Sequence, residues 1–419
     1  MIPGKMFEVM QPVRVMFGQG QITKLGEVAK TFGNRICLIT MKELVDLGLI
    51  EHAIAPLKKQ GLEVLIIDQA KPEPTCSDID ELVTQVRAAN PNVLVAFGGG
   101  SVMDVAKAVA IGVTHPEPIW MYVNLSNRPP LPIGPNVLPV IAIPTTSGTG
   151  AEVTPYAVLS NEDSIQKGTI KSPLIFPKIA IIDPEITLSL PRHMTLLTGI
   201  DAFAHATESY VNQVNRTPFS DLVASEAINV IYRGLPQLIG KLDSVDLRTQ
   251  LAWGSMLAGV AIANAGTTVA HALAQPLGAH THLPHSLTVA IFTLPVLRHT
   301  WSADIERFAG LKRCLHGESM NAGSVHTQAQ EAVEMIDSWM EGLELVKSFP
   351  AIEKSDDLEE RLLGDVLGYM SRPLAQHPKK FSEQELQEII QEALGPLTSQ
   401  EGERKFQIES KPNALEAYV

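Results

Sequence analysis

The stretch VLVAFGGGSVMDVAKAVA, residues 93–110, joins an apolar, β-branched run to a helical pattern through three consecutive glycines. Glycine lets backbone amides approach a ligand closely, and the positive end of the following helix favours a bound anion. We expect Ser101 to cap this helix and Asp104 to lie in its first turn, where a carboxylate suits the helix dipole. The spacing is not G-x-G-x-x-G, so a strand-to-helix turn without a ligand is an alternative interpretation. The candidate nucleotide contacts here are Gly98, Gly99, Gly100, Ser101 and Asp104.

Short β-branched runs of the same character lie on both sides of this stretch, at 35–40, 62–68, 138–144 and 178–183. Helical patterns separate them, for example at 43–60 and 77–89, and the Pro- and Gly-rich segment 124–136 is typical of a loop. This alternation predicts an α/β fold with a mainly parallel sheet covered on both faces. The run VRVMFGQG, residues 13–20, predicts a further strand and turn at an edge of the sheet.

The pattern changes near SLPRHM, residues 189–194, after which β-branched clusters thin out and long helical patterns dominate. A chain of 419 residues is too long for one core. We therefore expect a dinucleotide-binding α/β domain at 1–191 and an all-α domain at 192–419. The polar, weakly patterned tail 398–419 is expected to pack loosely.

The composition favours a cytoplasmic enzyme. A net charge of -13 argues against general attraction to nucleic acid or to an anionic membrane. The three cysteines are scattered, which favours a reducing compartment and no disulfide framework. We see no signal-peptide pattern at the start and no uninterrupted apolar run of membrane-spanning length.

A second glycine-rich segment, IPTTSGTGAEVT at residues 143–154, follows another apolar strand. In open α/β sheets, ligands bind outside the carboxyl ends of the strands, so both loops are expected at the same edge. Two such loops favour a dinucleotide site more than either loop alone, although an ordinary Thr/Ser-rich turn is the simpler reading. The hydroxyl candidates are Thr145, Thr146 and Thr149.

The stretch TGIDAFAHATESYV, residues 198–211, places Asp201 and His205 one helical turn apart on the same face. Their oxygen and nitrogen atoms could bind one metal ion, although an ordinary Asp–His hydrogen bond is the alternative. The segment AHALAQPLGAHTHLPHS, residues 270–286, holds four more histidines and is expected to be helical up to about Gln275, with another helix starting near LPHS. Three imidazoles and one carboxylate would suit Fe(II) or Zn(II), if two of these histidines meet the pair.

These two segments together resemble the signatures of the iron-containing, or group III, alcohol dehydrogenases, within the dehydroquinate synthase-like superfamily. Further landmarks follow the order of that family: FGQG (17–20), KPEPT (71–75), FGGGSVMDVAKAVA, IPTTSGTGAEVT and HPKKFSEQELQEIIQEAL (377–394). The resemblance implies a metal in the cleft between an α/β and a helical domain. It carries the metal ligands over to Asp201, His205, His271 and His285, and leaves His280 and His282 as non-ligands.

Three positions depart from the family pattern. Gln275 stands where the family commonly has a second histidine near the nicotinamide, which puts a proton relay there in doubt. Ser286 replaces the glycine of the usual PHG. Met41 stands where NAD-preferring members tend to carry an Asp that binds the ribose hydroxyls and repels a 2′-phosphate. The cofactor is therefore expected to be NAD or NADP, with the choice open.

The resemblance implies an alcohol dehydrogenase or aldehyde reductase of class EC 1.1.1.-, which transfers hydride between NAD(P)(H) and a small primary alcohol or aldehyde. It implies Fe(II), with Zn(II) as the alternative ion, and a homodimer. Lys167 aligns with a position near the cofactor, although a solvated loop lysine is an equal reading. Tyr156 and Gln275 are candidates for the substrate pocket, with core packing as the alternative for Tyr156.

Three rival functions remain at this point. A zinc-dependent, glycerol-dehydrogenase-like polyol enzyme is the nearest, but such enzymes usually show fewer of these motifs and three protein ligands. A dehydroquinate synthase would need lysines and arginines near its histidines for a phosphate-bearing substrate, and the helical half shows no such cluster. A nucleotide-binding sensor with a structural metal is disfavoured because both loops and all four ligands are present.

Overall fold

The computed structural model describes residues 6–125, 128–316, 323–350 and 357–398. A six-stranded parallel sheet forms the first half, with the strand order β1-β8-β5-β4-β2-β3. Its strands are β1 (Arg14–Phe17), β2 (Arg35–Ile39), β3 (Glu63–Ile67), β4 (Val93–Gly98), β5 (Val140–Pro144) and β8 (Ile179–Ile182). The five predicted β-branched strands and the edge strand near residue 13 are therefore confirmed.

Helices cover the sheet because its central strands are apolar on both faces. Every residue of β4 and β5 is buried, as a strand between two helical layers requires. The covering helices are α1 (Leu25–Lys30), α2 (Lys42–Asp46), α3 (Glu51–Lys59), α4 (Cys76–Ala89) and α5 (Gly100–Gly112). The helical pattern expected at 43–60 is two helices, because Gly48 takes a φ of 72° and ends the first.

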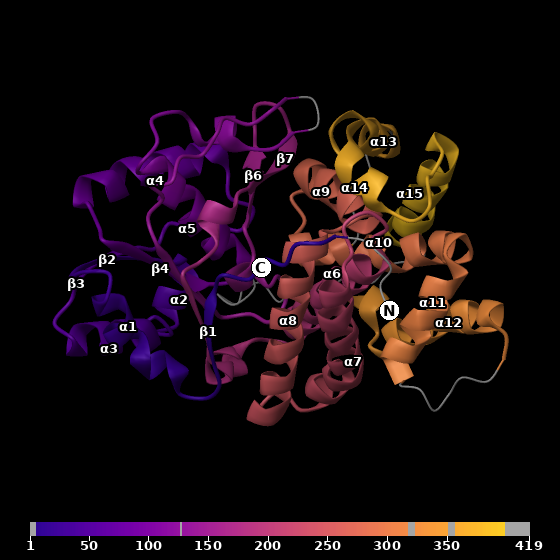
Figure 1. The fold of residues 1–419 in the computed structure, drawn as a ribbon, viewed down its shortest axis with the longest axis horizontal. Helices are drawn as coiled ribbons and strands as arrows, with labels where there is room; N and C mark the ends of the chain where they lie inside the picture. Colours follow the sequence, from indigo (N-terminus) through magenta and orange to yellow (C-terminus); the bar gives the residue numbers. More distant parts are fainter. Residues whose placement is uncertain (1–5, 126–127, 317–322, 351–356, 399–419) are drawn as a thin grey trace.

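A two-stranded antiparallel hairpin, β6 (Tyr156–Asn161) and β7 (Gln166–Lys171), stands apart from the main sheet. It extends from the α/β half towards the helices (Figure 1), and β7 packs against α9 (Val269–Thr281). The sequence analysis did not predict this hairpin.

After β8, the described residues form helices and connecting segments only (Figure 1). The main helices are α6 (Arg192–Val211), α7 (Pro218–Gly240), α8 (Val245–Ala265), α9, α10 (His285–Thr300), α11 (Ile305–His316), α12 (Val325–Gly342), α13 (Leu358–Tyr369), α14 (Ser371–Gln376) and α15 (Glu383–Thr398). Their apolar faces share one large core. The structure thus has the α/β first half and mostly helical second half that the sequence predicts.

The sequence predicted one helix over residues 263–275. The structure instead has two helices that meet there. The helix α8 ends at Ala265, and Gly266 takes a φ of 83° that breaks the pattern before α9 begins. The α9 helix then runs past Gln275 to Thr281. No single helix of the described residues is long and apolar enough to cross a membrane, and the α8–α9 pair, which passes only jointly, is bent by 101°. Beyond Thr398, the predicted loose tail lies outside the described residues.

Candidate metal and nucleotide site

Four side chains from three helices converge on one point. Asp201 and His205 lie on α6, His271 lies on α9, and His285 is the first residue of α10. One ligand atom from each lies within 4.8 Å of the others. The Nε2 atoms of His205 and His271 are 2.9 Å apart, and each lies 3.8–3.9 Å from Oδ1 of Asp201. The structure therefore brings together the four residues that the sequence singled out.

The chemistry of this cluster fits a divalent transition metal. Both carboxylate oxygens of Asp201 are buried and have no hydrogen-bond donor among the described residues. A buried, unpaired carboxylate is costly unless a cation compensates it. Burial, together with the charges of His271 and Lys167, holds the pKa of His285 well below its usual range. The imidazole is therefore neutral, as a metal ligand must be.

Glu208 supports this cluster from behind, and the sequence analysis missed it. Its Oε1 accepts hydrogen bonds from the backbone amides of Thr268 and Ala270, at 2.9 and 3.0 Å, and its Oε2 contacts Nδ1 of His271. Burial alone would raise the pKa of Glu208, but the His271 imidazole and the bonds from Thr268 outweigh it and lower the pKa to about 2. The carboxylate therefore holds His271 with Nδ1 protonated and Nε2 turned to the other ligands.

The signal for Glu208 was present in the quoted stretch TGIDAFAHATESYV. Asp201, His205 and Glu208 are spaced by four and then three residues, so all three lie on one face of α6. A buried carboxylate one turn beyond a metal-ligating histidine is the arrangement expected of a group that orients another ligand.

The two predicted loops lie side by side at the carboxyl edge of the sheet. Gly98 and Pro144 are register partners of β4 and β5, and the Thr145 amide donates to the Gly98 carbonyl at 3.0 Å. A Cβ added to Gly100 would lie 2.6 Å from the Cγ2 atom of Thr149, so the close approach of the loops requires glycine there.

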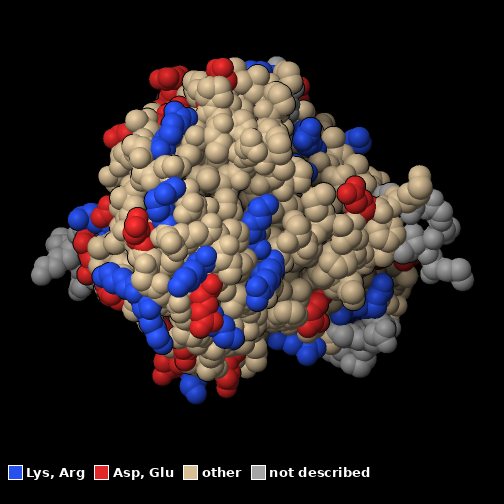
Figure 2. Space-filling model, turned by 60° about the vertical axis from the view of Figure 1, so that its left-hand side comes forward, with Lys and Arg blue, Asp and Glu red and all other residues tan. Residues whose placement is uncertain are grey.

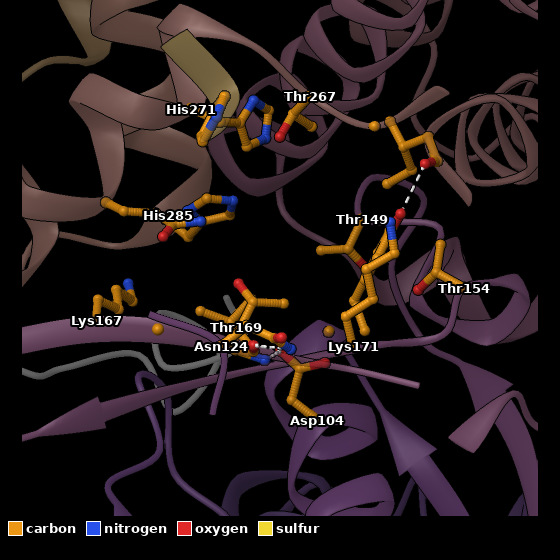
Figure 3. Close-up of a pocket in the computed structure, with 18 of the residues that line it drawn as sticks. Asp104, Asn124, Thr149, Thr154, Lys167, Thr169, Lys171, Thr267, His271 and His285 are labelled. Atoms are coloured by element: carbon orange, nitrogen blue, oxygen red, sulfur yellow. Dashed lines mark hydrogen bonds between the residues drawn. The ribbon is translucent and has the colours of Figure 1, made fainter. Parts of the chain in front are cut away.

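A cavity of about 610 Å³ connects these loops with the histidine cluster. Figure 3 shows His271, His285 and Thr267 from the helical half on one side, and Asp104, Thr149 and Lys171 from the α/β half on the other. Of the predicted site residues, those that line it are Gly100, Ser101, Asp104, Thr146, Thr149, Tyr156, Lys167, His205, His271, Gln275 and His285. Gly98, Gly99, Thr145 and Asp201 lie just behind this lining.

The start of α5 differs from the prediction. The N-cap residue is Gly99 rather than Ser101, and Ser101 lies within the helix. The first turn contains no acidic residue, because Asp104 lies one turn further along. Its Oδ2 accepts a hydrogen bond from the Val158 amide at 3.1 Å, so Asp104 anchors β6 at the cavity instead of favouring the helix dipole. Burial raises the pKa of Asp104 to about 7.

Lys167 is buried at the metal end of the cavity, on β7, rather than on a solvated loop. Figure 3 shows it beside His285, and its ammonium group contacts the carboxylate of Glu73. Burial lowers the pKa of Lys167 to about 7, while the Glu73 carboxylate favours the protonated form. When protonated, Lys167 adds to the causes that lower the pKa of His285.

The other predicted positions are arranged as follows. The Tyr156 hydroxyl donates to the Ile262 carbonyl at 3.0 Å, which fixes its ring in the cavity wall. Ser286 is buried and lines the cavity. Met41 does not line the cavity; its side chain is 1% exposed and belongs to the core of the α/β half.

The two remaining histidines of the α9 segment lie outside the cluster. His280 is in the last turn of α9 and interacts with Asp365 of α13 through Nε2, at 2.7 Å. His282 ends that helix in a left-handed conformation, with a φ of 57°. Neither residue belongs to the group of described side chains that could hold a metal.

A cluster of metal-ligand side chains that shares a cavity with two glycine-rich loops is the arrangement of a metal-dependent oxidoreductase. Residues 12–184 match the iron-containing alcohol dehydrogenase family, and residues 195–394 match the C-terminal part of the Fe-containing alcohol dehydrogenase family. The chain belongs to the iron-containing alcohol dehydrogenase family, and it is an alcohol dehydrogenase.

Similar proteins agree with this membership. Long-chain-alcohol dehydrogenase 1 of Geobacillus thermodenitrificans is 33% identical over 90% of this chain and 94% of its own length. The NAD-dependent methanol dehydrogenase of Bacillus methanolicus is 29% identical over 91% of this chain and 98% of its own. The solved alcohol dehydrogenase of a halo-thermophilic archaeon from a Red Sea brine pool superposes with a TM-score of 0.86 at 27% identity, covering 93% and 99% of the two chains.

Proposed function

We propose that this enzyme transfers hydride between a nicotinamide cofactor and a small primary alcohol or its aldehyde. The observation that carries the proposal is that one cavity joins the four-ligand cluster to both glycine-rich loops. The nicotinamide and the alcohol would then meet where the cavity passes His285 and Lys167. We further propose residues 1–191 and 192–419 as its two domains.

We infer that Asp201, His205, His271 and His285 hold Fe(II), or Zn(II), since both ions accept imidazole and carboxylate ligands. When bound there, such an ion lowers the pKa of an alcohol hydroxyl and polarises an aldehyde carbonyl. Glu208 orients His271 from behind. The cavity walls exclude water and hold the reacting carbons close, which is the remaining task of the protein.

For the nucleotide, we propose that the pyrophosphate lies across Gly98 to Ser101 and Thr145 to Thr149, at the start of α5. Met41 offers no carboxylate that could bind ribose hydroxyls or repel a 2′-phosphate, and its side chain is turned into the core. We therefore expect NAD and NADP to work with less than about a hundredfold difference in kcat/KM, which is under ~3 kcal/mol. Kinetics with both cofactors and one good aldehyde check this, and a thousandfold preference for either contradicts it.

The test of the proposed function is the consumption of NAD(P)H by the iron- or zinc-loaded enzyme with a panel of aldehydes. His271→Ala should lower metal content and turnover together, because it removes one of four ligands. His280→Ala is the matched control, since His280 lies on the same helix outside the cluster. Full metal occupancy in His271→Ala, by elemental analysis, would show that the ligand assignment is wrong.

We also propose that the enzyme is a cytoplasmic homodimer. Its three cysteines are free, which agrees with a reducing compartment. The edge strand β1 leaves one side unpaired, and Met6, Phe7 and Val9 expose apolar surface shortly before it. Acidic and basic side chains are interspersed on the face shown in Figure 2, consistent with small-molecule substrates rather than nucleic acid.

A further inference from the structure

Two cations line the cavity away from the metal ligands, and the proposed reaction does not use them. Lys171 is the last residue of β7, and Arg372 lies on the short helix α14. Each comes from a different half of the chain, and both contribute to the wall of the same cavity. A third cation, Arg128, also lines the cavity, but it donates to the Trp120 carbonyl at 2.7 Å.

Lys171 lies beside the ring of Tyr156, and Arg372 belongs to the wall of the same cavity. Lys171 is the register partner of Tyr156 across the hairpin, and its ammonium nitrogen lies 5.4 Å from the centre of the Tyr156 ring. The charge of Arg372 acts on both side chains: it adds to the effect of burial in lowering the pKa of Lys171, and it opposes the effect of burial on the pKa of Tyr156. Both cations therefore line one cavity, and the charge of Arg372 is felt at Lys171.

In the described part of the chain, this pair has no carboxylate partner. Among the described residues, no Asp or Glu lies within ion-pair distance of Lys171 or Arg372. The two carboxylates that line the cavity are otherwise engaged, since Glu73 contacts Lys167 and Asp104 accepts from the Val158 amide. Lys171 and Arg372 are solvent-accessible at this wall, and two cations without a carboxylate partner among the described residues can bind an anion there.

The position of Lys171 on β7 indicates which part of a ligand the two cations would contact. Alternate residues of a strand face the same side, and Lys167, Thr169 and Lys171 all line the cavity. Lys167 lies at the metal end, beside His285 (Figure 3). Four residues along a strand span about 13 Å, so Lys171 lies several carbon–carbon bonds away from the reacting centre.

We propose that the substrate is an aliphatic primary alcohol or aldehyde that carries an anionic group, a carboxylate or sulfonate, at the end remote from the reacting carbon, held by Lys171 and Arg372. This inference rests on the proposed function. The metal end of the cavity receives the oxygen that reacts, and the cation pair fixes the opposite end of the chain. Such a substrate is bound at both ends, which positions its reacting carbon.

The first experiment compares kcat/KM for ω-oxocarboxylates of three to six carbons with neutral aldehydes in which an isopropyl group replaces the carboxylate. We expect a preference of roughly tenfold or more for one anionic chain length, and we expect it to weaken as ionic strength rises. Sulfonate analogues decide whether the site requires a carboxylate or accepts any monoanion. Equal kcat/KM for charged and neutral aldehydes at every length overturns the proposal.

Substitutions then assign the effect to the pair. Lys171→Met and Arg372→Gln should each lower the ratio of anionic to neutral kcat/KM by roughly tenfold. Lys171→Glu should reverse the preference towards betaine aldehyde, a gain that damage to the fold cannot produce. Lys178→Met is the matched control, because Lys178 is exposed like Lys171 but does not line the cavity; it should leave the ratio unchanged.

Two further measurements separate this inference from its alternatives. Titration of NAD(P)H fluorescence tests whether the pair instead binds the cofactor: an equal loss of NAD(P)H affinity and of anion preference in Lys171→Met contradicts the proposal. Calorimetric binding of glutarate, an unreactive dicarboxylate, needs no turnover. Glutarate binding that Lys171→Met abolishes, in an enzyme that reduces no aldehyde, supports the anion site and refutes the proposed reaction. An enzyme that reduces neutral aldehydes but does not bind glutarate supports the proposed reaction and refutes the anion site.

Discussion

At the scale of single residues, Glu208 determines which nitrogen of His271 faces the other ligands. A carboxylate in contact with Nδ1 requires a proton on that nitrogen, so Nε2 keeps its lone pair. The same carboxylate satisfies free amides at the start of α9, at Thr268 and Ala270. One side chain therefore fixes both the position of the helix and the tautomer of its histidine.

Glu208→Gln is expected to weaken metal binding by about 10- to 100-fold, because an amide nitrogen can face Nδ1 and favour the other tautomer. Competition with a calibrated chelator measures this change. Circular dichroism should show a retained fold, since the Gln carbonyl can still accept from the start of α9. Unaltered metal affinity in a folded Glu208→Gln enzyme would remove Glu208 from its positioning role.

Ionisation of the buried carboxyl of Glu152 is expected to make the free energy of unfolding depend on pH. Burial raises its pKa from 4.5 to about 7, against the opposing charge of Lys107. The folded state therefore keeps a proton that the unfolded state loses, and the free energy of unfolding falls as pH rises from about 4.5 to about 7. The shift corresponds to at most about 3 kcal/mol.

Urea unfolding at pH 5 and pH 7.5 checks this prediction. Glu152→Gln should reduce the loss of stability between the two pH values, because the amide does not ionise. Part of the loss should remain, since burial also raises the pKa of Asp104. Glu51→Gln, at an exposed helix position, is the control. An identical pH dependence in Glu152→Gln and the wild type would mean that Glu152 ionises normally in the folded state.

At the scale of elements, the threonine-rich loop is held against two helices by glycines. Gly150, with a φ of 61°, lies against Gly259 in the middle of α8, and a Cβ on Gly259 would lie 2.7 Å from the Gly150 carbonyl oxygen. A Cβ on Gly148 would meet the backbone of Thr198 on α6, at 2.9 Å from its carbonyl oxygen. The nucleotide loop of the α/β half is thus seated directly on the helices of the metal half.

Gly259→Ala is therefore expected to displace the loop, to lower the affinity for NAD(P)H and to destabilise the fold by about 1–3 kcal/mol. Gly364→Ala is a sharp control, because Gly364 is also inside a helix and has nothing within 4 Å of an added Cβ. That variant should gain up to about 1 kcal/mol from helix propensity. Fluorescence titration and thermal unfolding measure both variants, and equal behaviour of the two contradicts the packing argument.

The sequence predicted well those strands and helices whose hydrophobic pattern results from burial alone. The central strands are apolar on both faces, and the long helices repeat at helical spacing, so burial alone identifies them. The β6–β7 hairpin escaped because Lys167, Thr169 and Lys171 face a cavity rather than a core, which leaves Ile170 as the only apolar β-branched residue of β7. The site was predicted to the extent that motifs marked it. Glu208 was missed although its spacing on α6 placed it on the face of Asp201 and His205. Glu73 and Arg372 reach the cavity only through the fold.

At the scale of the whole molecule, the cavity exists because two differently built halves meet. The sheet contributes its carboxyl edge with both loops, and the helices contribute all four metal ligands. The hairpin reaches from the sheet half to the helices, placing Lys167 beside His285 at one end and Lys171 at the other (Figures 1 and 3). The reacting atoms would then lie at the junction of the halves, away from solvent.

The proposed dimer provides the last prediction. The sheet has two open edges, β1 and β3. The amides of Arg14 and Gly18 bond to β8, so the intervening amide of Val15 points to the free side. Val15→Pro removes that outward donor and spares the bonds to β8, so we expect it to convert a dimer into a monomer of 45.4 kDa.

Ile66→Pro is the matched control on the other edge, because the amide of Glu63 bonds to Asn34 and the amide of Ile66 points away from β2. Light scattering at assay concentration decides between the outcomes. The interface is assigned to β1 if the wild type and Ile66→Pro are dimers and Val15→Pro is a monomer. Only the outward amide of β1 is then required for pairing. The reverse pattern assigns it to β3, and a monomeric wild type refutes the dimer altogether. Activity measured alongside shows whether the site needs the second chain.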